Sequence, residues 1–224
     1  NNLLWSIKMK TLKINIGCGQ APIKGWQNYD NSWSIRLAKK PLVALFLMKV
    51  GMLSLPQQKF IAFAQKEDIL WANAIKYLPE KTNSVDVIYS SHMIEHIEKN
   101  DLKIFFKEAR RVMKIGATIR IAVPNISFHI ENYLNSEDAD RFIEATHLTR
   151  KRPKSIASKI KYLITGDRNH QWMYDGKSLC KLLLSAGFEE PVVMAEGHTN
   201  IVNPGALNLR ERSPESVFVE TKNM

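Results

Sequence analysis

The segment Leu12–Asp30, LKINIGCGQAPIKGWQNYD, constrains the fold more than any other part of the chain. A short apolar run ends in Gly17-Cys18-Gly19, and the acidic Asp30 follows a short way on. A strand that ends in a glycine turn brings bare backbone close to a ligand, because only glycine turns so tightly without a Cβ in the way. An acidic residue beyond the turn can accept hydrogen bonds from a ribose diol. The pattern therefore predicts a nucleoside-type ligand at the carboxyl end of a parallel sheet.

Size, charge and cysteine content limit the class of protein. The 224 residues suit one α/β domain with a substantial core. A net charge of +10 favours an anionic partner, which could be an acidic or phosphorylated substrate, nucleic acid or a membrane surface. The two cysteines, Cys18 and Cys180, lie in the glycine turn and in a helical pattern, so we expect no disulfide and a reducing, cytoplasmic compartment. Residues 1–10 contain no signal-peptide apolar region of adequate length.

Strand-like and helix-like apolar periods alternate along the chain, which predicts a mainly parallel sheet with helices on both faces. The predicted strands are Leu12–Gly17, Ile69–Ala72, Val85–Ser90, Thr118–Val123, Val192–Ala195 and Ser216–Thr221. The predicted helices are Ile35–Leu53, Gln57–Gln65, Asp101–Ile115, Ser127–Leu134, Glu137–Thr146 and Asp175–Ala186.

Two of these helices have the clearest amphipathic pattern. In Asp101–Ile115, apolar residues recur at i, i+3 and i+4, and we expect Asp101 to cap the start and Gly116 to end the helix. Asp175–Ala186 has the same pattern, and Gly187 should terminate it.

Two surface segments have unusual composition. Pro41–Leu55 is strongly apolar and follows Lys39-Lys40, but it is too short to span a membrane. A buried or lid helix and an interfacial membrane anchor both fit this segment. Arg150–Lys161 is basic, and Arg150–Lys154 could bind phosphate or anionic lipid, although such runs are usually solvated. Because no aromatic residues are interleaved in the run, we do not expect a nucleic-acid partner.

Further motifs follow in a fixed order: ILWANAIKYLP at 69–79, NSVDVIYSSHMIEH at 83–96, RVMKIGATIRIAVPN at 111–125 and YDGKSLCKLLLSAGF at 174–188. The ordered set resembles the class I S-adenosylmethionine-dependent methyltransferases. With GWQNYDNS, HQWMYDGKSL and RERSPESVFVE, it resembles small predicted bacterial methyltransferases found with cell-surface polysaccharide biosynthesis genes. The resemblance implies one domain over residues 1–224, with a Rossmann-like seven-stranded sheet whose last strand is antiparallel. It also implies methyl transfer from S-adenosylmethionine.

The resemblance also assigns residues to the cofactor. The glycine turn would lie under its methionine and ribose parts, and Asp30 would accept from the ribose hydroxyls, although a turn or cap aspartate is the alternative. Asn73 stands where the family usually has an acid that holds the adenine amino group. The cofactor-binding residues implied are Gly17, Cys18, Gly19, Asp30, Asn73, Ala74, Ser90 and Ser91.

The chain departs from the family pattern in three ways. Asn15 replaces an acid that normally helps to hold the cofactor's ammonium group, and Asn73 replaces the adenine-binding acid. The spacing from Gly19 to Asp30 is also short, so the first crossover helix should be reduced or absent. This short spacing argues against a dehydrogenase.

Candidate catalytic groups lie outside the glycine turn. His92 should line the pocket, and His170 could take a proton from a substrate hydroxyl. His92 and His96 are at i, i+4 with Glu95 between them, but the HExxH order is absent and no third ligand is evident. We therefore expect no metal and interpret Glu95-His96 as a structural helix start.

Three further residues are candidates for binding the substrate. Trp172 and Tyr174 could stack on a sugar ring or cover the cofactor, and Arg210 could bind an anionic substrate. The structural alternatives are that His170 and Tyr174 tie an insertion to the core, that Asp175 caps a helix, and that Arg210 joins a surface ion-pair network.

The sequence thus predicts a methyltransferase in which the insertions Ile35–Lys66 and Ile126–Thr165 form a lid over the substrate pocket. The expected acceptor is an oxygen, or less often a nitrogen, of a small molecule or saccharide precursor, and it is anionic if the basic charge reflects the substrate. The alternatives are a non-catalytic cofactor-binding partner in a biosynthetic assembly and a protein that binds RNA or an anionic surface. Peripheral membrane contact and the oligomeric state stay open.

Overall fold

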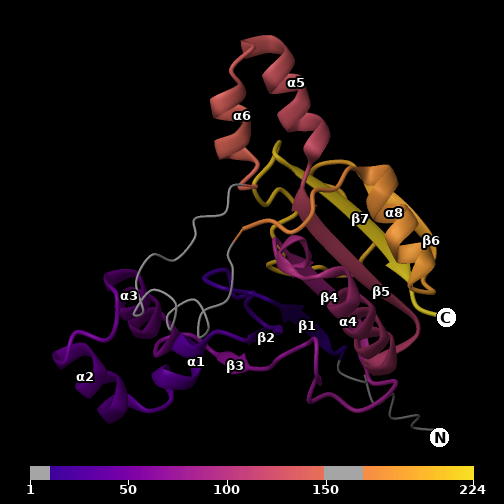
Figure 1. The fold of residues 1–224 in the computed structure, drawn as a ribbon. Coiled ribbons are helices and arrows are strands. Elements are labelled where there is room, and N and C mark those ends of the chain that lie inside the picture. Colours follow the sequence, from indigo (N-terminus) through magenta and orange to yellow (C-terminus); the bar gives the residue numbers. More distant parts are fainter. Residues whose placement is uncertain (1–10, 149–168) are drawn as a thin grey trace, which may run out of the picture.

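The computed structural model describes residues 11–148 and 169–224. Its centre is a seven-stranded sheet in the order β3-β2-β1-β4-β5-β7-β6 (Figure 1). β7 is antiparallel to both of its neighbours and the other pairings are parallel, as the Rossmann-like fold class predicts. The strands are β1 (Lys13–Ile16), β2 (Gln27–Asp30), β3 (Ile69–Trp71), β4 (Val85–Ser91), β5 (Met113–Pro124), β6 (Glu189–Met194) and β7 (Ser216–Lys222).

In the described residues, helices lie in four of the connections and segments between the strands. The first of these lies between β2 and β3 and forms one end of the molecule (Figure 1): α1 (Trp33–Ala38), α2 (Pro41–Lys49) and α3 (Leu55–Ala64). The 3₁₀ helix η1 (Ile94–His96) and α4 (Lys99–Val112) join β4 to β5, α5 (Ile126–Ser136) and α6 (Ala139–Ala145) follow β5, and α8 (Gly176–Ser185) precedes β6. No helix in the described ranges combines the length and the apolar character needed to cross a bilayer.

The main core lies between the sheet and the pair α4 and α8. Phe105 and Phe106 of α4 and Leu179 and Leu183 of α8 are buried against Ile and Val side chains of β1, β4, β5 and β7. These positions recur at helical spacing, so a single apolar stripe on each helix faces the sheet. Both predicted amphipathic helices are therefore core elements.

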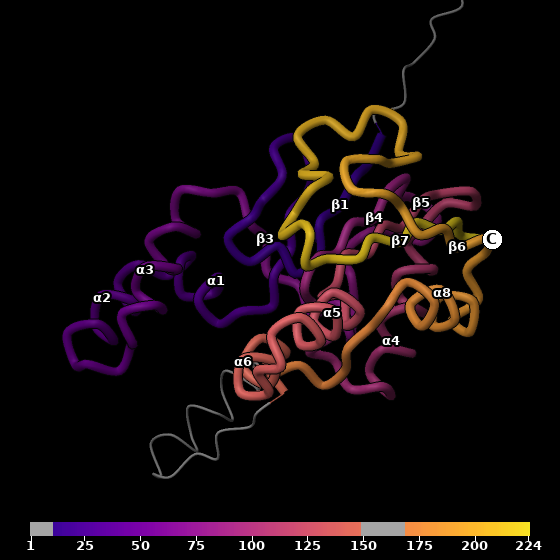
Figure 2. The backbone as a smooth tube through the Cα atoms, turned by 90° about the horizontal axis from the view of Figure 1, so that it is seen from above, coloured from indigo at the N-terminus to yellow at the C-terminus, as the bar shows by residue number. Residues whose placement is uncertain are grey.

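The opposite face of the sheet is covered mainly by loops. Tyr89 of β4 and Phe218 of β7 pack with Trp26 from the β1–β2 connection and with Ile201 and Leu207 from the β6–β7 connection. Figure 2 shows the β6–β7 connection, in yellow, on the side of the sheet away from α4 and α8. Loop residues thus complete the second half of the core.

Three predicted boundaries are wrong, each for a local reason. Ile35–Leu53 forms two helices, because Pro41 lacks an N–H and restricts Lys40, so a new helix begins at Pro41. α4 ends at Val112, and Gly116 lies inside β5 with φ +76°. Asp101 lies in the first turn of α4, since the helix begins earlier.

The strand β2 was absent from the predicted elements. Its sequence, QNYD, has no alternation of apolar and polar residues, yet it pairs in parallel with β1 on one edge and β3 on the other. Pairing on both edges supplies the hydrogen bonds that local propensity does not. By contrast, Asp175 caps α8 in a capping box and Gly187 follows its end with φ +87°, as predicted.

The β1–β2 connection contains no helix, as the short spacing predicted. Its shape depends on two buried asparagines. Asn15 donates from its amide to the Ala21 carbonyl and to Asn28 Oδ1, both at 3.1 Å. Asn28 in turn accepts from Ile23 N at 2.7 Å and donates to the carbonyls of Ile23 and Trp26. The amide at Asn15 therefore faces two acceptors.

We expect Asn15→Asp to lower the free energy of unfolding by about 1–3 kcal/mol, because a buried carboxylate would replace a donor opposite two acceptors. Urea denaturation measures this change. Asn132→Asp, at an exposed position of α5, is the matched control and should stay within about 0.5 kcal/mol of the parent. Equal stability of both variants would contradict the role given to Asn15.

Candidate active site

A cavity of about 790 Å³ lies at the carboxyl ends of β1 to β4. Strand order reverses between β1 and β4, and ligands of open α/β sheets bind in the crevice at such a point. The cavity is lined by the glycine turn after β1, by Asp30 at the end of β2, by Asn73 after β3, and by Ser91 and His92 at the end of β4. The sheet topology thus collects the predicted residues from four separate strands.

The glycine turn is held by a single carbonyl of β2. The N–H groups of Gly17 and Cys18 both donate to Tyr29 O, at 2.8 and 3.0 Å. Gly17 has φ +73°, and a Cβ there would lie 2.8 Å from Met93, so only glycine fits this position. Burial raises the pKa of the Cys18 thiol to about 12, so this thiol is neutral and unreactive.

Asp30 lies across the cavity edge from the turn. Its two carboxylate oxygens accept from Gly19 N at 3.0 Å and from Ser32 N at 2.7 Å. Burial raises the pKa of Asp30 above its ordinary value, although the two backbone N–H groups oppose the shift. A carboxylate has about four acceptor positions, so two remain for the hydroxyls of a ribose.

Of the remaining predicted cofactor residues, three line the cavity and one is buried beneath it. Asn73 and Ala74 line the cavity after β3, and Asn73 Oδ1 accepts from Ile75 N at 3.3 Å. Ser91 also lines the cavity. Ser90 is buried beneath it, with its hydroxyl 3.7 Å from the Met93 sulfur, and so supports the wall without lining it.

His92 lies where β4 leaves the sheet, with φ +48°, and it lines the cavity. Its Nε2 is 2.9 Å from the Ser216 hydroxyl, and its Nδ1 is 3.4 Å from Glu95 Oε1. This position places an imidazole between the glycine turn and the strand β7.

His170 is not among the residues that line the cavity; it belongs to a cluster behind the cavity wall. Glu95, His96 and His170 offer ligand atoms that all lie within 4.8 Å of one another. Burial lowers the pKa of His170 to about 4, against the opposing charge of Glu95. His170 is therefore neutral at pH 7 and a weak proton acceptor. Sequence spacing did not reveal it as a neighbour of the Glu95-His96 pair, because a long connection separates them.

The three predicted substrate residues lie elsewhere. Trp172 is 44% exposed and stacks under the Lys99 ammonium, 3.5 Å from the ring centroid. Tyr174 is buried in the main core, where burial raises its pKa to about 12. Arg210 forms an exposed ion pair with Glu196 at 3.4 Å. Tyr174 and Arg210 lie where their structural alternatives placed them, and none of the three residues lines the cavity.

Their neighbours Gln171, Glu211 and Arg212 line the cavity instead. Glu211 accepts a 2.8 Å hydrogen bond from the Tyr89 hydroxyl. The RER motif at residues 210–212 was a usable signal, but only the turn geometry decides which of its side chains point inward.

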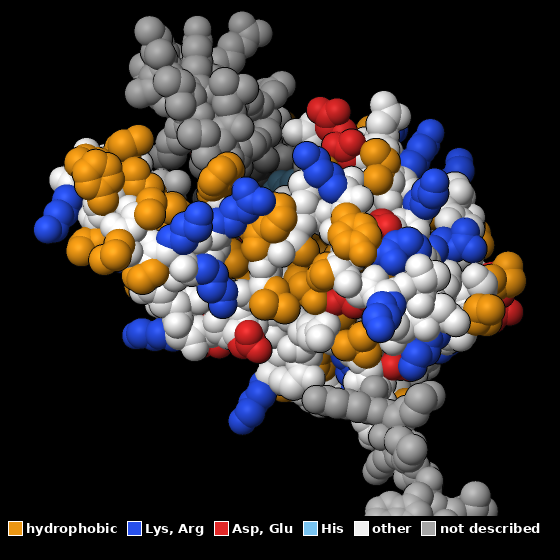
Figure 3. Space-filling view, turned by 90° about the horizontal axis from the view of Figure 1, so that it is seen from below, with side chains coloured by type: hydrophobic (Ala, Val, Ile, Leu, Met, Phe, Trp, Pro, Cys, Tyr) orange, Lys and Arg blue, Asp and Glu red, His pale blue; other side chains and the backbone are white. Residues whose placement is uncertain are grey.

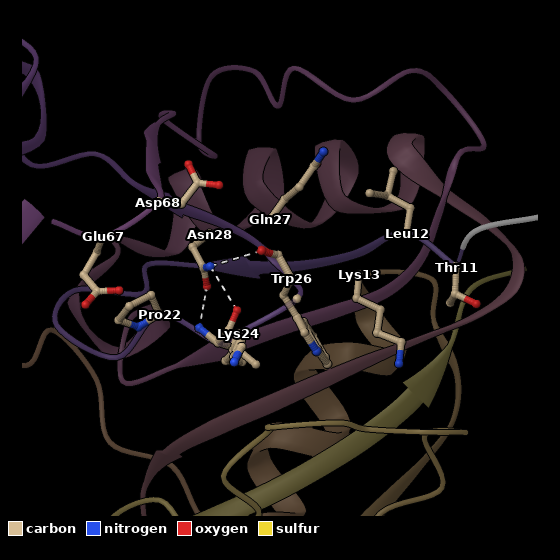
Figure 4. Close-up of a pocket in the computed structure, with 12 residues that line it drawn as sticks. Thr11, Leu12, Lys13, Pro22, Lys24, Trp26, Gln27, Asn28, Glu67 and Asp68 are labelled. Atoms are coloured by element: carbon tan, nitrogen blue, oxygen red, sulfur yellow. Dashed lines mark hydrogen bonds between the residues drawn. The ribbon is translucent and has the colours of Figure 1, made fainter. Parts of the chain in front are cut away.

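A second cavity, of about 610 Å³, lies at the opposite edge of the sheet (Figure 4). Lys13, Trp26 and Gln27 line it at the amino ends of β1 and β2, beside the Asn28 hydrogen bonds. Because ligands of this architecture bind at the carboxyl ends of the strands, we place the active site in the first cavity.

The chain is similar to known methyltransferases in part of its sequence and in its fold. Residues 51–121 match the family model of a methyltransferase domain. The fold is similar to S-adenosylmethionine-dependent methyltransferases from Thermotoga maritima and Methanosarcina mazei, each with 16% identity and a TM-score of 0.50. Both alignments cover 95% of this chain, with 82% of the first protein and 92% of the second. No curated protein matches in sequence.

The fold is thus the Rossmann-like fold of class I methyltransferases. Together, the family-model match and this fold support a methyltransferase with S-adenosylmethionine as its cofactor. The basic run at 150–161 and the final part of the predicted insertion 126–165 lie outside the described residues.

We expect Asp30→Ala to weaken S-adenosylmethionine binding by about 1.5–3 kcal/mol, the range for hydrogen bonds to a charged group. Calorimetric titration measures the change. Asp68→Ala removes an exposed aspartate beside the second cavity and should leave the affinity unaltered. Unchanged affinity in Asp30→Ala would exclude Asp30 as the ribose acceptor.

Proposed function

We propose that the protein transfers the methyl group of S-adenosylmethionine to an oxygen, or less often a nitrogen, of a small-molecule or saccharide acceptor. One observation carries the proposal: a single cavity joins the glycine turn and Asp30 to His92, Gln171 and Glu211. The first group suits a nucleoside cofactor, and the second offers polar side chains that can hydrogen-bond to an acceptor.

We assign the cofactor to Gly17, Cys18, Gly19, Asp30 and Asn73, with Ala74 and Ser91 completing its side of the cavity and Ser90 supporting the wall. The side-chain oxygen of Asn73 accepts one backbone hydrogen bond and has a second lone pair for the adenine amino group. Asn15 does not line the cavity, so its replacement of an acid serves the β1–β2 connection.

Methyl transfer depends mainly on the alignment of nucleophile, methyl carbon and sulfur. One proton acceptor near the incoming oxygen is then sufficient. We assign this role to His92, because it lines the cavity, whereas the neutral His170 lies behind the wall. The ring nitrogen Nδ1 of His92 lies 3.4 Å from Glu95 Oε1.

The test measures cofactor binding and turnover separately. Calorimetry with S-adenosylmethionine and S-adenosylhomocysteine should show micromolar binding, and release of S-adenosylhomocysteine should depend on an added hydroxylated acceptor. Tight binding with no turnover across a panel of alcohols, sugars and amines would instead favour a non-catalytic cofactor-binding partner.

We expect His92→Asn to lower kcat about 100-fold or more while the cofactor Kd stays unchanged. Asparagine tolerates the positive φ at this position, so the backbone should be preserved. His198→Ala, an exposed position in the β6–β7 connection, is the control. Full turnover in His92→Asn would show that alignment alone drives the reaction.

We also propose that α2 docks the protein on an anionic lipid surface. Leu42 and Phe46 are 82% and 62% exposed, and further apolar side chains surround them at the α1–α3 end of the molecule (left in Figure 3). Residues 31–66 contain Arg36, Lys39, Lys40, Lys49, Lys59 and Lys66 but no acidic residue. Apolar contact flanked by cations fits the boundary of a bilayer that carries negative headgroups.

Vesicle co-sedimentation tests this contact. The protein should bind phosphatidylglycerol-containing vesicles, bind phosphatidylcholine vesicles less, and lose binding in Leu42→Glu/Phe46→Glu and at high salt. The matched control Ile115→Glu/Val202→Glu alters two residues that are 81% and 79% exposed elsewhere. Equal binding by both double variants would contradict the proposal, as would a dimer in light scattering that only the α2 variant abolishes.

A further inference from the structure

The side chain of Glu95 is fully buried, and neither of its carboxylate oxygens has a hydrogen-bond partner. Buried carboxylates are normally paired and hydrogen-bonded, because removing an ionised group from water costs several kcal/mol. Its nearest cationic candidates are His92 Nδ1 at 3.4 Å and His96 Nε2 at 3.8 Å. Both distances exceed those of good hydrogen bonds, so the charge of Glu95 is left without a counterpart.

The tautomer of His96 does not provide a hydrogen bond to the Glu95 carboxylate. Its Nδ1 lies 3.1 Å from the Asn169 carbonyl, which can only accept, so Nδ1 carries the proton. In the neutral ring, Nε2 then presents a lone pair toward the Glu95 carboxylate. Either a proton or a metal ion between these two electron-rich atoms would stabilise them in a buried space.

His170 completes the arrangement from a distant part of the chain. Its ring lies 5.0 Å from the His96 ring, and its Nδ1 is buried without a hydrogen-bond partner. The segment is fixed in place, because Gln171 N and Trp172 N both donate to the Glu95 carbonyl, at 2.7 and 3.2 Å. The backbone of Glu95 therefore positions the third group beside its own carboxylate.

We propose that Glu95, His96 and His170 bind a divalent transition-metal ion. Two imidazoles and one carboxylate are a donor set for Zn²⁺, Fe²⁺, Co²⁺ or Mn²⁺. With metal–ligand distances of about 2.1 Å, tetrahedral ligand atoms lie about 3.4 Å apart. His96 Nε2 and Glu95 Oε1 are 3.8 Å apart and the three ligand atoms lie within 4.8 Å of one another, so the side chains would move closer together around a bound ion. The hydrogen bond from His96 to a backbone carbonyl is the kind of outer contact that orients a ligating histidine.

The site borders the active-site cavity, since His96 also lines that cavity. Three protein ligands leave at least one coordination position open. An ion held there would supply a Lewis acid for an acceptor oxygen in the cavity, and this role in catalysis rests on the proposed function. This conclusion departs from the expectation of no metal, which rested on the lack of a third ligand in the sequence.

Metal binding itself is independent of the proposed function and is tested without cofactor or acceptor. Tag-free full-length protein, stripped with a chelator, is titrated with Co²⁺ and the visible absorption is followed; Zn²⁺ and Mn²⁺ are then titrated in competition. We expect one equivalent to bind with micromolar affinity or better. Glu95→Gln, His96→Ala and His170→Ala should each weaken binding about tenfold or more, whereas His198→Ala should not.

A thermal melt of every protein with and without Zn²⁺ provides a second readout. A bound ion should raise the Tm of the parent and of His198→Ala but not of Glu95→Gln, which preserves the shape of the side chain. Absence of stoichiometric binding by all three ions would overturn the proposal and leave Glu95 paired with a protonated histidine. Parent-like binding in Glu95→Gln or His170→Ala would also overturn it, and either result leaves the test of methyl transfer unaffected.

Discussion

The hydrogen bond between Asn15 and Asn28 is the interaction on which the active site depends. In the usual crossover between parallel strands a helix fills the connection and satisfies its own backbone. Here β1 passes to β2 without a helix, and the two buried amides bind the backbone of Ala21, Ile23 and Trp26 instead. That connection begins at Gly17 and returns the chain to Tyr29, whose carbonyl holds the turn. A substitution of either asparagine would therefore alter the glycine turn after β1 and the position of β2 together.

A second buried polar pair has the corresponding role on the other side of the cavity. Arg120 of β5 and Glu220 of β7 are fully or almost fully buried and 2.7 Å apart. Arg120 also donates to the carbonyls of His198 and Leu209, and Glu220 accepts from Thr199 and Asn200, so the pair fastens the β6–β7 connection to the sheet. Because this connection carries Glu211 and Arg212 into the cavity, both walls are loops whose shape is set by buried polar contacts.

The sequence was sufficient for features with a strong local signal. The glycine turn, the acid after it, and the amphipathic faces of α4 and α8 indicated the fold class, and the turn and the acid do line the cavity. β2 was missed because its stability comes from pairing on both edges, and Gly116 was misplaced because β5 extends the chain directly from α4. The environment of His170 was beyond prediction, since it depends on two backbone hydrogen bonds to the Glu95 carbonyl across a long separation. Asn15 stands where the resembling family has an acid that helps to hold the cofactor's ammonium group, and its hydrogen bonds to Ala21 and Asn28 show that it is a structural donor.

The cavity and the outer surface of the protein carry different charges, so they suit different partners. The net charge of +10 suggested an anionic ligand, yet the cavity is lined by Asp30, Glu98, Asp101 and Glu211, with Arg212 as its lining arginine. S-adenosylmethionine carries a sulfonium and an ammonium group, so an acidic cavity attracts it although the whole molecule is basic. The six cations in residues 31–66 are exposed, where they can meet an anionic surface without repelling the cofactor. In such a molecule the net charge of the whole chain indicates the charge of partners that bind the outer surface. The charge of the residues that line the cavity indicates which ligands bind inside it. An anionic acceptor would then require a local cation, and among the described residues that line the cavity Arg212 is such a group.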